Sequence, residues 1–110
     1  MCNVGDLAII WLEMRYGIIF APEALDDLRR ARKSDASIIL DAVELHLRHA
    51  PELVSKSRIK RLREVRSPQY RLRIDEWRVF YDVVEGSVLI RGVVRKPDAS
   101  DWLAQFGEPS

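Results

Sequence analysis

The sequence predicts one α+β domain in which two helices cover one face of a twisted, mainly antiparallel sheet. Three observations lead to this fold class. Residues 70–81 alternate apolar and polar side chains on both sides of Asp75-Glu76, as in a β-hairpin with a short loop. Residues 22–50 contain two successive stretches with apolar residues at helical spacing. The chain of 110 residues, 47% of them hydrophobic, is long enough for one modest core.

The hairpin separates an apolar face from a basic face. A two-residue loop would pair positions across it in the order Ile74–Trp77, Arg73–Arg78 and Leu72–Val79. The face toward the core then carries Tyr70, Leu72, Ile74, Trp77, Val79 and Tyr81, and the other face carries Arg71, Arg73 and Arg78. Like charges opposite each other on a sheet are destabilising, so either local carboxylates or a bound polyanion must offset them. The hairpin alone leaves both interpretations open.

The first expected element is a strand over residues 15–20. Residues 1–13 show no clear period, so we expect an N-terminal extension outside the fold, with Met14 as the start of the domain. The alternative is an extra strand or helix that packs on the domain. The single cysteine, Cys2, has no partner for an internal disulfide bond, which fits a reducing, cytoplasmic compartment.

Two helices follow this strand. Pro22 suits the first turn of a helix, and acidic residues near its start and basic residues up to Lys33 favour the helix dipole. Ser34 or Asp35 can cap a second helix, which runs to about Ala50, before Pro51. Because the connection is short, we expect the two helices to form an antiparallel pair.

The rest of the chain adds strands and a short helix. We expect strands over residues 58–63 and 88–94, a turn at residues 67–69 and another at Glu85-Gly86, where glycine can adopt a positive φ. Folding the last strand back places Arg91 opposite Phe80 on the arginine face, which nothing is expected to cover. After Pro97, residues 98–106 form an amphipathic helix. The order is therefore β-α-α-β-β-β-(β)-α, with one domain over residues 14–106 and a tail at residues 107–110.

Basic residues concentrate in one quarter of the chain. Residues 54–81 hold nine basic and three acidic residues, a net charge of +6, although the whole chain carries only +1. A basic block in an acidic remainder is typical of a protein that binds nucleic acid or an acidic protein segment. We assign this general role to Lys60, Arg61 and Arg63.

Several other classes of function lack support in the sequence. No apolar run reaches the length of a membrane span, so no membrane partner is expected. His46 and His49 lie three apart on a helix but lack a carboxylate–cysteine set around them, so we read them as half-buried or capping residues and predict no metal site. There is no glycine-rich phosphate loop or nucleophile elbow, and we expect no cofactor.

The order of elements and the hairpin motif resemble the RelE/ParE superfamily of bacterial toxins. The motif is Tyr-Arg-Leu-Arg at residues 70–73, a tight turn, Trp-Arg-Val-Phe-Tyr at residues 77–81 and a closing strand. The resemblance covers residues 14–106 and implies the toxin half of a type II toxin–antitoxin pair, with an antitoxin as protein partner. RelE-like members cleave mRNA on the ribosome without a metal, through attack of the RNA's own 2′-hydroxyl on the adjacent phosphate.

The resemblance also implies which residues form the site. The positions that bind the scissile phosphate and stabilise its charge fall on Arg71, Arg73, Arg78 and Lys96, which we take as the catalytic set. Arg95 lies beside Lys96, and with Arg91 it is assigned to RNA binding. The C-terminal aromatic residue that stacks on a base falls on Trp102.

Three functions follow from the resemblance. The first is an mRNA endoribonuclease that inhibits translation, either free or ribosome-dependent, and we favour it because four basic residues converge on one face. The second is a ParE-like toxin that inhibits DNA gyrase and cleaves nothing. The third is an inactive relative that only binds the antitoxin. Arginine is a poor general base because its pKa exceeds about 12, so the sequence supplies the phosphate-binding half of a nuclease site without a clear proton-transfer half.

Overall fold

The computed structural model describes residues 15–109. The predictions for residues 1–13, Met14 and Cys2 lie outside this range. The elements are β1 (Gly17–Phe20), α2 (Pro22–Arg30), α3 (Lys33–Leu47), β2 (Ile59–Arg61), β3 (Val65–Ser67), β4 (Tyr70–Ile74), β5 (Trp77–Val84), β6 (Ser87–Arg95), the 3-10 turn η1 (Lys96–Asp98), α4 (Ala99–Phe106) and β7 (Glu108–Pro109). Within the described range, no helix combines the length and apolar character that a membrane span requires.

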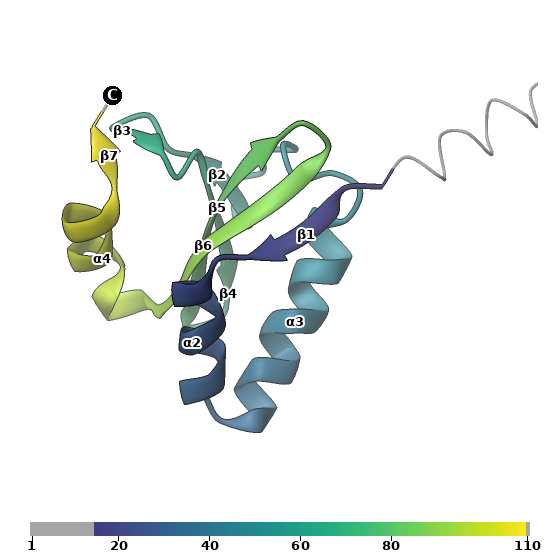
Figure 1. Ribbon diagram of the computed structural model, residues 1–110, viewed down its shortest axis with the longest axis vertical. Helices are drawn as coiled ribbons and strands as arrows, with labels where there is room; N and C mark the ends of the chain where they lie inside the picture. The colour runs from purple at the N-terminus through teal and green to yellow at the C-terminus, as the bar shows by residue number, and fades with distance from the viewer. Residues whose placement is uncertain (1–14, 110) are drawn as a thin grey trace, which may run out of the picture.

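A five-stranded sheet in the order β1-β6-β5-β4-β2 forms the centre of the fold. Only β1 runs parallel to its neighbour, β6, and the other pairs in this sheet are antiparallel. Helices α2 and α3 lie side by side on one side of the sheet, and α4 lies on the other (Figure 1). The α+β fold class, with an antiparallel helix pair on a mainly antiparallel sheet, is therefore confirmed.

The central hairpin has the predicted register. Strands β4 and β5 pair Ile74 with Trp77, Arg73 with Arg78 and Leu72 with Val79. Asp75 in the loop adopts a φ of 49°, a left-handed conformation that aspartate tolerates better than most residues. The second turn is also as predicted, since Gly86 has a φ of 79°.

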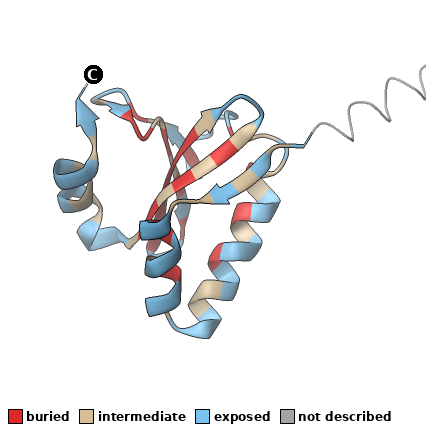
Figure 2. Ribbon diagram, in the orientation of Figure 1, coloured by how far each residue is buried: buried red, intermediate tan, exposed pale blue. Residues whose placement is uncertain are grey.

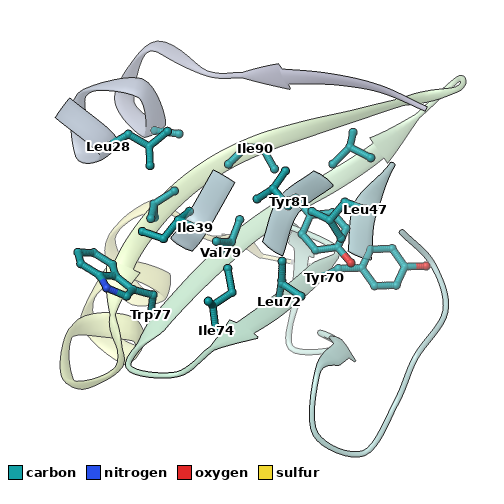
Figure 3. Close-up of a cluster of buried hydrophobic side chains, with 14 of the residues drawn as sticks. Leu28, Ile39, Leu47, Tyr70, Leu72, Ile74, Trp77, Val79, Tyr81 and Ile90 are labelled. Atoms are coloured by element: carbon teal, nitrogen blue, oxygen red, sulfur yellow. The ribbon is translucent and has the colours of Figure 1, made fainter. Parts of the chain in front are cut away.

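The core lies between the helix pair and the apolar face of the sheet. Leu72, Val79 and Tyr81 project from the central strands and are completely buried (Figure 3). From α3, Ile39, Val43 and Leu47 reach the same core, and their spacing of four places them on one side of the helix. The buried positions therefore follow the inner faces of the elements, while the outer surfaces of α2 and α3 are exposed (Figure 2).

The helix boundaries differ from the prediction at the connection between the two helices and at the end of α3, which is Leu47 instead of about Ala50. Helix α2 ends at Arg30, and α3 already begins at Lys33 with Arg32 as its N-cap residue and no side-chain cap. The expected caps, Ser34 and Asp35, lie inside the first turn of α3. The prediction was wrong because cap preference is a local tendency, whereas here the position of the turn follows from the packing of both helices on the sheet.

His46 is half-buried on α3, as the sequence predicts. Burial, followed by the charge of Arg58, lowers the pKa of His46 below its usual value. Because the unfolded chain then binds the proton more tightly, the stability contributed by neutral His46 is full above the unfolded pKa of about 6.5 and falls as the pH decreases through it. We expect His46→Gln to show a weaker loss of unfolding free energy between about pH 7 and pH 5 than the unchanged chain, measured by urea denaturation. The two proteins are compared at pH 8 as a reference, and parallel pH profiles would contradict the prediction.

Candidate nucleic-acid interface

The outer face of the sheet, opposite the helix pair, carries a group of basic side chains. Arg71 on β4 lies opposite Lys60 on β2 and opposite Phe80 on β5, and Arg73 lies opposite Arg78. Because side chains alternate along a strand, all of these point away from the core. We call Arg71, Arg73 and Arg78 the arginine cluster. The structure thus brings together four of the predicted site residues, counting Lys60.

The members of the arginine cluster repel one another. Burial, followed by the charges of Arg78 and Arg73, lowers the pKa of Arg71. Arg71 is half-buried, and its Nε is buried without a hydrogen-bond partner. A buried donor without an acceptor is costly, and a bound anion would supply the missing acceptor. The cluster therefore has the electrostatic and hydrogen-bonding character of an anion site.

Arg78 differs from the other two members because it is buried. Only 6% of it is exposed, and its Nη1 donates to the backbone carbonyl oxygens of Asp75 at 2.8 Å and Trp77 at 2.9 Å. Burial, followed by the charge of Arg73, lowers its pKa, while Glu76 acts in the opposite direction. Arg78 consequently holds the hairpin loop in addition to contributing charge, so its removal would also disturb the fold.

The outer face is partly covered, contrary to the expectation that it is open. Trp102 on α4 stacks on Phe80 with ring centroids 4.7 Å apart and an angle of 3° between the planes. Phe106, one turn further along α4, packs against Trp102 with ring centroids 5.5 Å apart. The predicted base-stacking residue is therefore engaged within the chain. The amphipathic pattern of residues 98–106 predicts a helix, but it does not show which surface the helix covers.

The backbone at Gly92 accommodates the indole of Trp102. A Cβ atom at this position would lie 2.5 Å from Cζ2 of Trp102, much closer than a normal contact. We expect Gly92→Ala to displace Trp102 from Phe80 and to cost about 1–3 kcal/mol of unfolding free energy, as overpacking typically does. Thermal unfolding measures the cost. Gly86→Ala is not a suitable control because of the positive φ at Gly86. Gly17→Ala is the matched control, because a Cβ there meets only Oγ of Ser87, at an ordinary contact distance of 3.4 Å. An unchanged melting temperature for Gly92→Ala would contradict the prediction.

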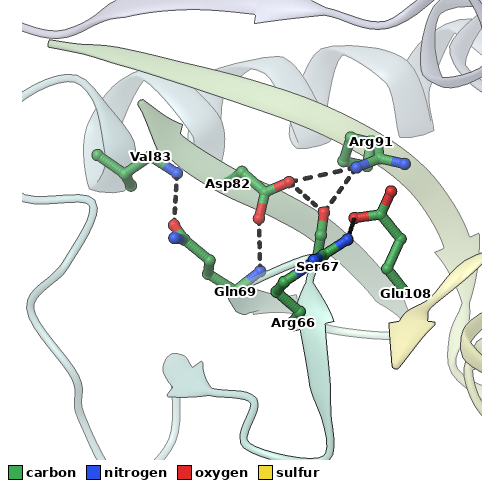
Figure 4. A network of polar contacts seen from close by, with 7 residues as sticks. All are labelled: Arg66, Ser67, Gln69, Asp82, Val83, Arg91 and Glu108. Carbon is green, nitrogen blue, oxygen red and sulfur yellow. Dashed lines mark hydrogen bonds and ion pairs between the residues drawn. The ribbon is translucent and has the colours of Figure 1, made fainter. Parts of the chain in front are cut away.

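A buried polar network lies on the outer face next to the stacked rings (Figure 4). Asp82 on β5 accepts hydrogen bonds from Oγ of Ser67 at 2.5 Å and from the backbone N–H of Gln69 at 2.7 Å. Arg91 donates to Ser67 at 2.6 Å and forms an ion pair with Asp82 at 3.3 Å. This network joins β3 to the centre of the sheet, and Arg91 is occupied in it.

The register around Arg91 also differs from the prediction. Phe80 pairs with Gly92, and Tyr81 pairs with Ile90, so Arg91 is the extra residue of a β-bulge. The expected pairing of Arg91 with Phe80 was wrong because a hairpin extrapolated from the turn at Gly86 assumes an unbroken ladder. The bulge places Arg91 beside Asp82 and Gly92 under Trp102.

Comparisons with known proteins identify the family. Residues 18–96 match the sequence model of the ParE toxin of the type II toxin–antitoxin system parDE. The chain belongs to this family. Among curated proteins, no sequence matches the chain. The match spans most of the chain and confirms the resemblance to RelE/ParE superfamily toxins.

Solved structures of similar fold come from toxin–antitoxin complexes. The RelBE2 complex of Mycobacterium tuberculosis matches with a TM-score of 0.62 and 20% identity, over 74% of this chain and 91% of that chain. The RelB–RelE complex of Methanococcus jannaschii matches with a TM-score of 0.59 and 20% identity, over 76% and 96%. The RelE–RelB complex of Pyrococcus horikoshii OT3 gives 0.60 and 19%, over 74% and 94%. At these identities the likeness establishes the fold.

Two of the assigned basic residues of this ParE-family chain lie on the helix side of the sheet. Arg61 pairs with Tyr70, lies over its ring at 5.1 Å and donates to the carbonyl oxygen of Gln69. Arg95 lies over the ring of Trp77 at 4.6 Å and forms an ion pair with Asp35 at 3.7 Å. The structure therefore does not bring Arg61 and Arg95 to the arginine cluster.

The remaining assigned residues lie near the ends of the outer face. The backbone N–H of Lys96 donates to the carbonyl oxygen of Glu76 at 2.7 Å. This bond places Lys96 at the hairpin loop, where Glu76 lies two residues before Arg78. Arg63 is exposed between β2 and β3. Among the described residues, no group of histidine, cysteine, aspartate and glutamate side chains is arranged to hold a metal ion. The prediction that no metal takes part remains a prediction.

Sequence reasoning placed Phe80 on this face only as the partner of Arg91, and it missed Asp82. Both alternate outward with Arg78, so the period of two already places them there. An aromatic residue and a carboxylate on a face otherwise read as basic indicate partners elsewhere in the chain. Their partners, Trp102 and Arg91, are 22 and nine residues away along the sequence, as their positions show, and local patterns do not identify them.

Proposed function

We propose that this toxin is an mRNA endoribonuclease whose arginine cluster binds the scissile phosphate. The observation that carries the proposal is the convergence of three guanidinium groups on the outer face, with one buried Nε that has no acceptor. A phosphodiester offers the negative charge that the cluster lacks and an acceptor oxygen for Nε of Arg71. Lys60 and Lys96 flank the cluster and extend the positive surface along an RNA strand.

The proposed reaction needs charge stabilisation more than covalent chemistry by the protein. The ribose 2′-oxygen bonds to the adjacent phosphorus and the bond from phosphorus to the 5′-oxygen breaks, which leaves a 2′,3′-cyclic phosphate. The 2′-hydroxyl loses its proton, and the departing 5′-oxygen gains one. Arg71 and Arg73 stabilise the charge that develops on the phosphate oxygens. Because arginine stays protonated near neutral pH, the proton acceptor lies outside the cluster. A ribosome-dependent reaction is consistent with a proton acceptor that lies outside the arginine cluster.

An antitoxin is the proposed protein partner. The solved structures of similar fold are complexes of a toxin with its antitoxin. On the helix pair, several apolar side chains are exposed, among them Leu25, Ile38 and Leu45, of which Leu45 is 75% exposed. Exposed apolar groups on neighbouring helices suit an amphipathic partner helix. The outer face suits an acidic segment.

A second candidate function is inhibition of DNA gyrase without cleavage. Two observations favour it. The cluster consists of arginines alone, which bind phosphate but transfer protons poorly. Trp102, the expected base-stacking residue, is engaged with Phe80. A gyrase inhibitor requires neither a proton acceptor nor a base-stacking ring.

Expression of the full chain in bacteria tests the proposal. We expect growth arrest within minutes and new 5′ ends on translated messages, detected by primer extension. Arg73→Ala should abolish both effects because Arg73 is exposed and its side chain contributes charge to the cluster without burial in the core. Lys33→Ala is the matched control, since it removes one exposed positive charge on α3, away from the outer face.

The outcome separates the candidate functions. Intact messages together with DNA breaks would reject cleavage and support the action on gyrase. Growth without arrest, with soluble protein present, would leave only the antitoxin-binding role. Loss of cleavage in Lys33→Ala to the same degree as in Arg73→Ala would show that the effect does not depend on the arginine cluster.

A further inference from the structure

We propose that Phe80 is a nucleobase-stacking site and that Trp102 occupies this site until RNA binds. The inference rests on the proposed function, because the base belongs to the RNA whose phosphate the arginine cluster binds. It adds a residue that the resemblance does not supply, and it reverses the role of Trp102. In this view Trp102 competes with the base instead of stacking on it.

The geometry of the two rings is that of a stacked base. Their centroids are 4.7 Å apart and the planes are nearly parallel, at 3°. Aromatic side chains that pack in cores commonly adopt offset or edge-to-face arrangements, and parallel stacking is also the way in which flat nucleobases bind aromatic side chains. The backbone at Gly92 leaves space for a flat ring, because a Cβ there would overlap the indole. A purine or pyrimidine would fit the same flat space.

Phe80 lies where a base and its phosphate could be held together. It is directly opposite Arg71 across the β4–β5 pair, and Arg78 precedes it by two residues on the same face. Phe80 itself is completely buried, which is unusual for a large apolar residue on the outer face of a sheet next to charged side chains. Removal of Trp102 would therefore expose an aromatic ring beside the arginine cluster. That combination of a stacking ring and guanidinium groups is typical of single-strand binding.

The attachment of helix α4 allows a nucleobase to replace Trp102 on Phe80. None of its eight residues is buried, and Trp102 itself is half-buried. Beyond α4, the strand β7 pairs with β3, and the ion pair between Arg66 and Glu108, at 3.7 Å, is exposed to solvent. A cavity of about 520 Å³ lies next to the indole, between α2 and α4, and is lined in part by Trp102, Phe106, Arg91 and Val94. The ring thus has space into which it can move.

The two roles of Trp102 predict opposite effects of Trp102→Ala. If Trp102 stacks on the base, the variant binds RNA more weakly. If Trp102 competes for Phe80, the variant binds more tightly, by about fivefold or more, because a stacking contact is worth at least about 1 kcal/mol. The probe is a short, fluorescently labelled single-stranded RNA, and the readout is its dissociation constant for the purified full chain by fluorescence anisotropy. The same oligonucleotide without bases controls for phosphate binding and should bind both proteins equally.

A disulfide that holds β7 on β3 tests the exchange directly. Val65 and Pro109 are partners in this antiparallel pair, so cysteines at both positions lie at a separation suited to a disulfide bond. In a Cys2→Ser background, we expect the oxidised Val65→Cys/Pro109→Cys protein to bind RNA at least about fivefold more weakly than after reduction. Pro109→Cys alone is the matched control and should not respond to reduction.

The results distinguish this inference from the proposed function. Weaker or unchanged RNA binding by Trp102→Ala would overturn the role of Phe80 while leaving RNA cleavage in place. If the unchanged chain binds neither RNA nor its base-free form, the proposed function fails, and the inference fails with it.

Discussion

Replacing Arg71 by alanine is expected to lower the rate of RNA cleavage by about two to three orders of magnitude, as loss of one charge-stabilising donor does in other acyl- and phosphoryl-transfer sites. Arg71 has a buried Nε without an acceptor. Its pKa is lowered first by burial and then by the charges of its two arginine neighbours. The hydrogen-bonding capacity of this Nε is thus unused within the described part of the chain. The rate is measured by single-turnover cleavage of a message in a cell-free translation reaction.

The unfolding free energy of Arg71→Ala distinguishes a role in cleavage from a structural role. Because Arg71 is repelled by Arg78 and Arg73, its removal should leave the unfolding free energy unchanged or raise it. Arg71→Lys keeps the charge but loses the planar donor group, so it should recover part of the rate. Arg29→Ala, on the exposed surface of α2, removes one charge elsewhere and serves as the control. A full cleavage rate in Arg71→Ala would remove this residue from the site, and a large loss of stability would assign it a structural role.

The central hairpin and its division into two faces could be predicted because the information is local. A period of two fixes which side chains share a face, and the loop at Asp75-Glu76 fixes the register of β4 against β5. The same reasoning places the arginine cluster on one surface without any knowledge of the remaining chain. The helix pair follows in the same way from spacing and from Pro22 and Pro51.

The contacts that shape the outer face could not be predicted because they join distant segments. The bulge at Arg91 depends on Asp82 and Ser67, which lie on other strands. The exposure of Trp102 depends on where α4 packs, and here α4 packs with Trp102 on Phe80. The helical period of residues 98–106 predicts which side of the helix is apolar, but it does not predict which surface that side covers. Sequence reasoning therefore located the arginine cluster and missed what occupies the surface beside it.

Arg61 and Arg95 illustrate the limit of a charge count. Both belong to basic stretches, yet each lies over an aromatic ring on the helix side of the sheet. Parity along β2 already indicates this for Arg61, because Lys60 points outward and its neighbour must point inward. The charge of a segment shows that basic residues are in excess, but it does not show where their side chains point. The alternation of side chains along a strand shows which of them share a surface.

Asp82→Ala is expected to lower the unfolding free energy by about 3 kcal/mol. Asp82 is 7% exposed and accepts hydrogen bonds from Ser67 and from the backbone N–H of Gln69, in addition to its ion pair with Arg91. Alanine would leave these donors without their acceptor. Urea denaturation measures the loss, with Asp101→Ala on the exposed side of α4 as the control.

The substitution should also weaken the attachment of the C-terminal segment. Ser67 belongs to β3, and β3 pairs with β7, so loss of the Asp82 network loosens the strand on which β7 rests. We expect earlier proteolytic cleavage between α4 and β7 in Asp82→Ala than in the unchanged chain. Asp82→Ala combined with Arg91→Leu should recover part of the lost stability, because the second change removes the guanidinium left without a partner. If Asp82→Ala unfolds at the same urea concentration as Asp101→Ala, the network does not hold β3 to the sheet, and the cover over Phe80 must depend on the Trp102 stack alone.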